Sequence, residues 1–551
     1  MSSAAAIPAF GVPKCNIVVC GSGNGAQTAA AVLGSQGHTV WLYYSPRYQQ
    51  RAAEMRAALA DNGGAITLTA HALPTAEAPD GTTTYKGAIQ GVSTNAAELL
   101  AAADVVLLSV TAPAMEGLIR ELAPHLRSQQ LLLFLQGTGA VNYMMLKAAL
   151  QDCIKAGPTS STTTSLADRM PMYAAAKVLP WACRLQAPAQ VTVCGTKERV
   201  KLALAPDACG LLRVMLPRLL DGLFPGTRFL LDANAVLEHT YFPYGLLCSD
   251  VIHPGMMYGT WAAWDGTPLP HKPLFYHSAS QEAADMIEAL TADTRAVIAA
   301  MCKQMGMAEA IHVPDARELM SALYGPQVAD PSCLLSALRS NAAYAGIYHP
   351  MKAVPLPAPA AATAAAAAAD SAGAAATEGA GTGYVPDFSC RLLSEDVPFG
   401  LVATRGIAEV LGVAIPCIDK VISWAQDKLG KEYLVGGKLC GKDVASSGAP
   451  QRFGVTRPEQ LVIGAEGVVA AAGAGLAAPV VAAAAAAATA AAAVQALLLP
   501  AQQFVGSRAA VQGVNASCAD DREFLNGLRA QSCPVLCRPA VGSFTRARMC
   551  V

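Results

Sequence analysis

Short apolar runs alternate with longer amphipathic stretches over the first third of the chain. The apolar runs are NIVVC (16–20), TVWLYY (39–44), DVVLLSV (104–110) and QLLLFLQG (130–137). Most of them are almost continuously apolar, which is typical of strands buried on both faces of a parallel sheet. The stretches 25–37 and 114–126 between them have helical spacing. This alternation predicts a doubly wound α/β domain, which we place at residues 14–205.

From residue 206 onwards the pattern changes to long helical periodicities. Apolar residues recur at helical spacing over 278–306, where Ser278 stands three residues before Gln281, as in a helix-capping box. The stretch 398–430 predicts two helices separated by a Gly-Val-Ala-Ile-Pro break. We therefore expect a mainly helical second domain at 206–464, so that the fold class is α/β plus all-α.

Two segments do not fit either pattern. Residues 353–388 are rich in Ala, Gly and Pro and predict a low-complexity insert within the second domain. Residues 465–551 form a further low-complexity and C-terminal extension, which contains an uncharged run at 467–500. That run is long enough for a membrane helix. However, alanine favours insertion weakly and no basic residues flank the run closely, so a low-complexity expansion is the preferred interpretation.

Composition narrows the possible function classes. The chain has 39 Lys and Arg against 40 Asp and Glu, with no block of like charge, so neither a nucleic-acid surface nor an anionic membrane is expected. The 16 cysteines are scattered, without a C-x-x-C pair or metal-ligand spacing, which indicates free thiols and no metal site. No secretion or transit signal precedes the first strand. We expect a cytoplasmic protein that acts on small molecules.

The turn after the first strand carries the clearest candidate chemistry. Gly21 permits a tight turn, Gly23 lets a pyrophosphate approach the backbone, and Ala26 lets the helix pack close to the strand. The helix N-terminus then offers free N–H groups to phosphates. The candidate cofactor-binding residues of this turn are Gly21, Gly23, Asn24, Gly25 and Ala26. A Rossmann-type dinucleotide site is predicted; the alternative is a glycine-rich turn without a ligand.

The end of the second strand bears on which nicotinamide is bound. NAD enzymes normally place an Asp or Glu there for the ribose hydroxyl, but LYYSPRY contains no carboxylate. Ser45 and Arg47 suit a 2′-phosphate better, so the expected cofactor is NAD(P)H with a preference for NADPH. Alternatively, Arg47 is a solvated residue that stacks on the adenine.

A second candidate site lies in SDVIHPGMMYGTWAAWDG, residues 249–266. Pro254 and Gly255 should end any helix here and leave the His253 imidazole at the edge of a loop. Aromatic residues, including Trp261, follow closely. A histidine in this position is either an acid/base group or a structural residue, and this stretch alone does not decide between them.

Several separated motifs, in a fixed order, resemble the octopine/nopaline (opine) dehydrogenase family. They are CGSGNGAQTAA (20–30), LPWACRLQ (179–186) with GTKERV after it, HPGMMYGTW (253–261), PLFYHSAS (273–280) and RLLSEDVPFGL (391–401). The resemblance covers roughly 14–464 outside the Ala-rich insert. It implies the reductive condensation of an amino acid with a 2-oxo acid such as pyruvate, through an imine and with NAD(P)H.

The resemblance also implies roles for particular residues. His253 matches the family's proton donor and acceptor, Asp396 the carboxylate that orients it, and Arg391 the group that binds a substrate carboxylate. Trp261 matches a tryptophan that packs on the amino-acid side chain. Gln136 is the candidate to contact the oxo acid, because the family's hydroxyl residue before LPW is absent here.

Two rival functions stay open. A related two-domain reductase, of the glycerol-3-phosphate or ketopantoate type, would use a lysine in an Asn/Lys motif that we do not find. A dinucleotide-binding sensor or scaffold would show no turnover. Without the resemblance, Arg391 and Asp396 would be interpreted as a surface ion pair.

Overall fold

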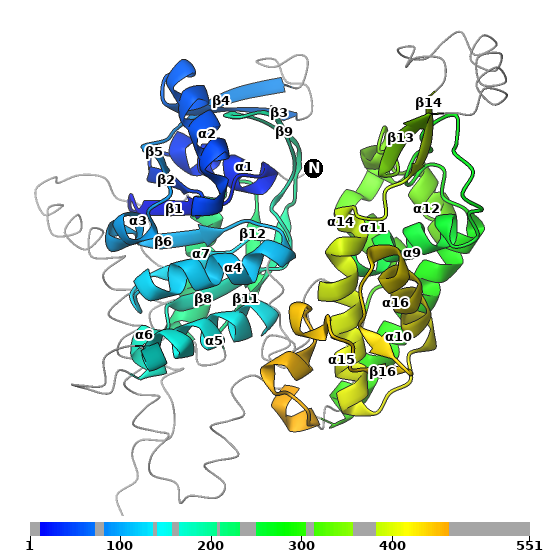
Figure 1. The fold of residues 1–551 in the computed structure, drawn as a ribbon. Coiled ribbons are helices and arrows are strands. Elements are labelled where there is room, and N and C mark those ends of the chain that lie inside the picture. The colour runs from blue at the N-terminus through cyan, green and yellow to red at the C-terminus, as the bar shows by residue number, and fades with distance from the viewer. Residues whose placement is uncertain are drawn as a thin grey trace, which may run out of the picture. The chain divides into compact units, whose positions relative to one another are not determined.

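The structure is a computed structural model that describes residues 12–71, 82–135, 140–156, 165–205, 210–231, 249–304, 313–355 and 382–461 (Figure 1). Gln136 and the extension 465–551 lie outside these ranges, and so does the uncharged run 467–500. Within the described ranges, no helix combines the length and apolar character that crossing a bilayer requires.

An eight-stranded sheet, in the order β12-β11-β8-β7-β6-β1-β2-β5, organises the N-terminal domain. Its strands are β1 (Asn16–Cys20), β2 (Thr39–Tyr43), β5 (Gly91–Ser93), β6 (Val105–Leu108), β7 (Leu131–Phe134), β8 (Met172–Ala176), β11 (Arg199–Leu204) and β12 (Arg228–Leu231). The four predicted strands are central and parallel, because β1 pairs with β2 and β6, and β6 pairs with β7. The predicted α/β domain is confirmed.

The sheet extends beyond the predicted domain boundary at residue 205. β11 runs antiparallel to β8, and β12 adds parallel to β11, so the domain reaches at least Leu231. The run RFLL at 228–231 is too short to be recognised as a strand from its pattern, and only its pairing with β11 makes it one.

A second sheet, in the order β4-β3-β10-β9, was not predicted. It contains β3 (Ala65–His71), β4 (Thr82–Ala88), β9 (Trp181–Ala187) and β10 (Gln190–Thr196). These strands carry many polar and half-exposed residues, unlike the continuous apolar runs of the main sheet. Helix α1 packs against this sheet as well as against β1 and β2.

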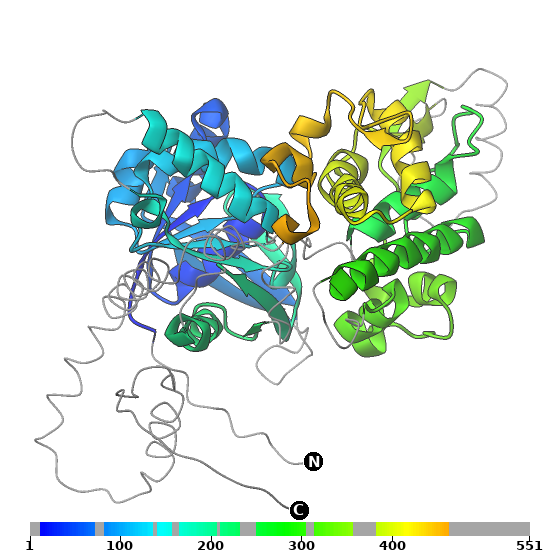
Figure 2. The same cartoon turned by 90° about the horizontal axis from the view of Figure 1, so that it is seen from below.

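Helices cover the strands of the N-terminal domain. They are α1 (Asn24–Ser35), α2 (Gln49–Asp61), α3 (Ala96–Ala102), α4 (Ala112–Leu122), α5 (Ala140–Ala156), α6 (Leu166–Arg169) and α7 (Gly210–Leu223). Helices α4 and α5 lie side by side (Figures 1 and 2). Fully buried strand residues such as Leu108 and Leu132 share one hydrophobic cluster with residues of α4 and α5.

The C-terminal domain is mainly helical, as predicted. Its helices are α9 (Ser249–Trp261), α10 (Gln281–Gln304), α11 (Ala316–Tyr324), α12 (Leu334–Ser340), α14 (Arg391–Ser394), α15 (Val402–Leu411) and α16 (Pro416–Leu429), with short strands β13 (Met351–Pro355), β14 (Thr382–Pro386), β15 (Leu434–Val435) and β16 (Lys438–Leu439). Helix α10 packs on α9, α15 and α16 (Figure 1). The predicted break between the last two helices is present at Gly412, which has φ +70°.

Helices α9 and α10 approach closely at two glycines. A Cβ on Gly255 would lie 2.6 Å from Ile287 Cγ1, and a Cβ on Gly259 would lie 2.3 Å from Ala283 Cα. The start of α10 differs from the expectation, because Ser280, not Ser278, accepts a hydrogen bond from the Ala283 N–H. The capping side chain is the one that directly precedes the first helical residue.

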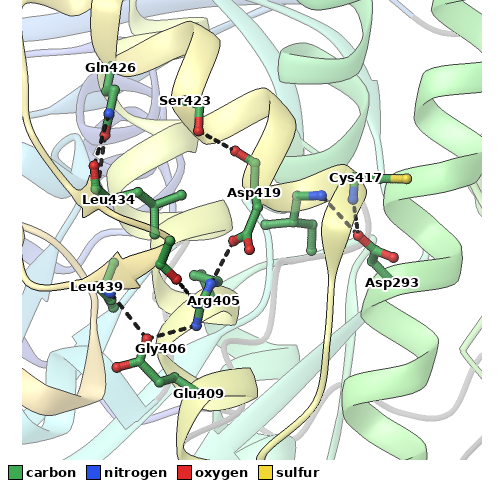
Figure 3. Close-up of polar contacts among 12 residues, drawn as sticks. Asp293, Arg405, Gly406, Glu409, Cys417, Asp419, Ser423, Gln426, Leu434 and Leu439 are labelled. Carbon is green, nitrogen blue, oxygen red and sulfur yellow. Dashed lines mark hydrogen bonds and ion pairs between the residues drawn. The ribbon is translucent and has the colours of Figure 1, made fainter.

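A buried arginine joins α15, α16 and the β15–β16 hairpin (Figure 3). Arg405 donates to Asp419 Oδ1 at 2.6 Å, to Glu409 Oε2 at 2.9 Å and to the Gly437 carbonyl at 2.8 Å. Asp293 on α10 accepts from the Cys417 N–H at the start of α16. Burial raises the pKa of the Asp419 carboxyl, and the nearby Arg405 charge opposes that effect.

The predicted insert at 353–388 is too long, because residues at both of its ends belong to strands. Its ends form an antiparallel ribbon in which Pro355 is paired with Thr382 and Met351 with Pro386. The residues of β14 are partly buried, including Tyr384. Only 356–381 therefore falls outside the described fold at this point.

Candidate active site

β1 and α1 form the predicted glycine turn. Gly21 has φ +133°, and a Cβ there would lie 2.4 Å from the Ser109 carbonyl oxygen, so a side chain is excluded. A Cβ on Gly23 would meet no heavy atom within 4 Å. Gly23 precedes α1, and within the described residues no side chain caps this helix. Its first N–H groups are thus suited to a pyrophosphate, and the turn fits a dinucleotide.

Three other residues of the turn have packing contacts. A Cβ on Gly25 would lie 2.5 Å from Ser109 Oγ, and Ala26 is fully buried. Asn24 Oδ1 accepts the Leu185 N–H of β9 at 3.1 Å, which ties the turn to the second sheet. Cofactor contact at these three positions stays a prediction.

The local sequence at the end of β2 has no carboxylate, but Glu121 of α4 lies beside it. Ser45 Oγ donates to Glu121 Oε1 at 2.9 Å, and Arg47 Nη2 donates to the same oxygen at 3.1 Å. Tyr43 donates to Glu121 Oε2 at 3.3 Å. Burial and the Glu121 charge raise the pKa of the Tyr43 phenol. Both residues predicted to bind a 2′-phosphate are therefore already bonded to an acidic side chain from α4.

His253 lies inside α9, so the prediction that Pro254 and Gly255 end a helix here is wrong. Pro254 cannot donate to the carbonyl four residues earlier, which weakens an isolated helix. Packing outweighs that loss, because Met256 and Met257 are fully buried and Gly255 lies against α10. The imidazole is therefore held by a rigid element instead of a loop.

Both ring nitrogens of His253 have partners. Nδ1 lies 2.7 Å from Asp396 Oδ2, and Nε2 lies 3.0 Å from the Tyr276 hydroxyl. The side chains of His253 and Asp396 are 16% and 11% exposed. A carboxylate can only accept, so Nδ1 carries a proton, and in the neutral imidazole Nε2 is then an acceptor. The structure thus brings together the two groups proposed as acid/base and orienter; their roles stay predictions.

The backbone around Asp396 is unusual. Asp396 ends the turn after α14 and precedes a π-helical segment, Val397–Leu401. Such segments are rare and frequently occur at functional sites. The neighbouring Glu395 is half-buried, and burial raises its pKa. An irregular turn thus carries both carboxyl groups.

Arg391 is the first residue of α14 and is exposed. Its charge acts to lower the pKa of Glu395, against the larger effect of burial. Asp396 is bonded to His253 and not to Arg391, so the surface ion pair considered above does not form. The guanidinium is therefore presented on the surface of this domain.

Trp261 closes α9 and is 4% exposed. Its Nε1–H donates to His349 Nδ1 at 3.1 Å, and the two rings meet edge to face at 5.1 Å. Burial lowers the pKa of His349 to about 4, which keeps its ring neutral. Phe275 packs on both His349 and His253. Trp261 thus belongs to an apolar wall beside the histidine, whereas Gln136 lies outside the described residues.

Sequence reasoning missed three residues, two beside His253 and one at the end of β2. Tyr276 lies in the motif PLFYHSAS, which contributed to the resemblance but received no role. His349 and Glu121 have no local sequence signal, because each meets its partners only through the fold. Tyr276 and His349, together with Asp396 and Phe275, give a histidine bonded on both sides in a mostly aromatic setting suited to proton transfer.

Comparisons with known proteins identify relatives of this chain. The family model described as "NAD/NADP octopine/nopaline dehydrogenase, alpha-helical domain" matches residues 247–429. Octopine dehydrogenase of Pecten maximus is 31% identical over 451 residues, which are 81% of this chain and 98% of that protein. Tauropine dehydrogenase of Arabella iricolor is 36% identical over 38% of this chain and 47% of its own length.

Similarity to solved structures also points to the octopine dehydrogenases. An octopine dehydrogenase structure with NADH and L-arginine is 28% identical, with a TM-score of 0.63 over 81% of this chain and 98% of that one. A yersinopine dehydrogenase is 13% identical with a TM-score of 0.50 over 80% and 98%, and it shares the fold. With the Pecten relative matched over nearly its full length, the chain belongs to the octopine/nopaline dehydrogenase family of oxidoreductases.

Proposed function

We propose that this protein is an opine dehydrogenase that condenses an amino acid with a 2-oxo acid such as pyruvate and reduces the imine with NAD(P)H. The observation that carries the proposal is the bond of 2.7 Å between His253 and Asp396, in a chain of this family. Structures of a 28% identical octopine dehydrogenase with NADH and either L-arginine or pyruvate support the substrate classes.

The chemistry of these side chains suits the reaction. Imine formation moves protons on and off nitrogen and oxygen near neutral pH, and histidine is the side chain that ordinarily titrates there. Asp396 holds the His253 tautomer and stabilises the imidazolium. The exposed Arg391 guanidinium suits the carboxylate of an oxo acid. Trp261 would form a wall of the amino-acid pocket.

The dinucleotide would be held at the turn formed by Gly21 and Gly23, whose backbone leaves room for a pyrophosphate. When bound, the reduced nicotinamide supplies the hydride. The chain's own residues supply proton transfer at His253 and anchoring of the substrate carboxylate at Arg391.

The first test is the loss of reduced-nicotinamide absorbance with purified protein, using NADH and NADPH in parallel. Pyruvate and other 2-oxo acids would each be combined with a panel of amino acids. We expect oxidation only when both partners are present. Oxidation with the oxo acid alone would instead identify a 2-oxo acid reductase, and no oxidation together with tight dinucleotide binding would identify a sensor or scaffold.

In the same assay, His253→Ala should lower kcat by at least about 100-fold and leave dinucleotide affinity unchanged.

The end of β2 also bears on cofactor preference. Ser45 and Arg47 favour NADPH by their chemistry, but Glu121 already accepts hydrogen bonds from both. A carboxylate at this position repels a 2′-phosphate and can accept from a ribose hydroxyl. We therefore propose that the enzyme prefers NADH.

Glu121→Gln tests this preference, because it keeps the side-chain shape and removes the charge. The ratio of kcat/KM for NADPH to that for NADH should rise by about tenfold, since Arg47 is released and the repulsion is lost. Glu54→Gln, on the exposed face of α2, serves as the control and should leave the ratio unchanged. A wild-type enzyme that prefers NADPH, or a Glu121→Gln variant with the same ratio as wild type, would contradict the assignment.

We also propose that the protein is cytoplasmic. Cys20 and Cys183 are buried free thiols, which suit a reducing compartment.

A further inference from the structure

Tyr276 occupies the side of the His253 ring opposite Asp396. Its hydroxyl lies 3.0 Å from Nε2, and the Asp396 carboxylate lies 2.7 Å from Nδ1. With the proton on Nδ1, Nε2 offers a single lone pair, and the tyrosine O–H donates to it. A substrate therefore cannot bond to Nε2 while the tyrosine stays in place.

Aromatic packing holds Tyr276 in place. Its ring stacks on Tyr344 with centroids 3.9 Å apart and an interplanar angle of 18°, and it meets Phe275 edge to face at 4.7 Å. The residue is 8% exposed. The backbone before it is fixed as well, because the Phe275 N–H donates to the Ile347 carbonyl and the His349 N–H to the Pro273 carbonyl. Moving the hydroxyl away from His253 would disrupt this stack.

We propose that Tyr276 is a further catalytic residue, which carries protons between His253 and the substrate. This inference rests on the proposed function. A hydroxyl has one donor and two acceptor positions, so its oxygen can bond to Nε2 and to a substrate atom together. A fixed tyrosine between base and substrate thus extends the reach of the histidine by one hydrogen bond.

The proton balance of the condensation fits such a relay. The substrate ammonium gives one proton to the Tyr276 oxygen while the tyrosine proton passes to Nε2, which leaves a neutral amine and an imidazolium. The amine nitrogen bonds to the oxo carbon, and one proton moves from nitrogen to oxygen to form the carbinolamine. The imidazolium proton then returns through Tyr276 to the carbinolamine hydroxyl. The C–O bond breaks, water leaves and the C=N bond of the iminium forms, so the proton taken at the start is the one given back.

The variant Tyr276→Phe tests the relay, because it removes the hydroxyl and keeps the ring that stacks on Tyr344. We expect kcat to fall by about 100-fold, with dinucleotide affinity unchanged. Tyr324→Phe is the matched control: it removes a hydroxyl one ring further along, edge to face with Tyr344 at 5.4 Å, and kcat should stay within about threefold of wild type.

A proton inventory separates a relay from a structural contact. In the wild type, a plot of kcat against the deuterium fraction of the solvent should be bowed, because two protons move together. In Tyr276→Phe the plot should be straight. A variant that keeps kcat within threefold, or a straight wild-type plot, would overturn the relay while the proposed function stands. Absence of amino-acid-dependent oxidation in the wild type would overturn both.

Discussion

Buried polar side chains near the candidate site are paired with residues far away in the chain. His253 is bonded to Asp396 and Tyr276, and Trp261 is bonded to His349. A buried polar group left without a partner costs about 1–3 kcal/mol, so each pair restricts the positions of the segments that carry it. The hydrogen bonds that fix the geometry of the site therefore also stabilise the folded protein.

His349 should make the stability of this domain sensitive to acid. Its pKa is about 4 in the folded protein because of burial, whereas an unfolded histidine titrates near pH 6.5. As pH falls from 6.5 towards 4, the unfolded chain takes up a proton that the folded chain excludes, so stability is lost. Between pH 7 and pH 5 the loss should be about 2 kcal/mol.

His349→Gln checks this prediction. The glutamine can accept from the Trp261 N–H but does not titrate, so the free energy of unfolding should depend less on pH than in wild type. The measurement is chemical denaturation of both proteins at pH 7 and pH 5. Equal pH dependence in the two proteins would show that His349 is not the buried neutral group.

At the scale of elements, α9 depends on its contact with α10. Its sequence contains a proline and two glycines, which do not favour a helix on their own. The glycines instead allow the two backbones to approach, so that burial compensates for weak propensity. His253 is therefore positioned by a helix that tertiary packing creates.

Gly259→Ala should destabilise the domain, although alanine is the better helix former. The new Cβ would lie 2.3 Å from Ala283 Cα and 2.5 Å from Ala283 N, so the α10 backbone must move. We expect the free energy of unfolding to fall by about 2 kcal/mol, measured by chemical denaturation. Gly195→Ala, where a Cβ meets nothing within 4 Å, is the control and should change it by less than about 0.5 kcal/mol. If Gly259→Ala were as stable as Gly195→Ala, α9 and α10 could move apart without loss of stability, and the prediction would be wrong.

At the scale of the whole molecule, the chain is longer than the relative that it matches almost completely. The Pecten maximus enzyme is matched over 98% of its length by 81% of this chain. The ribbon of β13 and β14 already brings the ends of 356–381 together, since Pro355 is paired with Thr382. The expansion at this position should therefore be dispensable.

Replacement of 356–381 by a short Gly-Asn-Gly-Ser loop should preserve kcat and KM for both substrates. It should also raise the free energy of unfolding by about 1 kcal/mol, because bringing β13 and β14 together costs less entropy when fewer residues separate them. The measurements are steady-state kinetics and chemical denaturation. A Gly/Ser segment of the original length separates the effect of length from that of sequence, and a large fall in kcat with the short loop would contradict the prediction.

The sequence by itself determined the elements whose signal is local. The four apolar runs of the central sheet, the glycine turn and the helix break at Gly412 could be predicted, because continuous apolar strands and positive-φ glycines follow from neighbouring residues. His253 and Asp396 could be named as partners only through the family's motifs. Their side chains lie within hydrogen-bonding distance in the structure.

Tertiary structure decided what depends on contacts between distant segments. It added β11 and β12 to the main sheet, formed a second sheet from polar strands, and kept His253 within a helix despite Pro254. It also placed the Glu121 carboxylate at the end of β2 and the Tyr276 hydroxyl within hydrogen-bonding distance of His253. Strand pairing, helix packing and hydrogen bonds between remote side chains are satisfied only in the assembled fold, and no local pattern of residues encodes them.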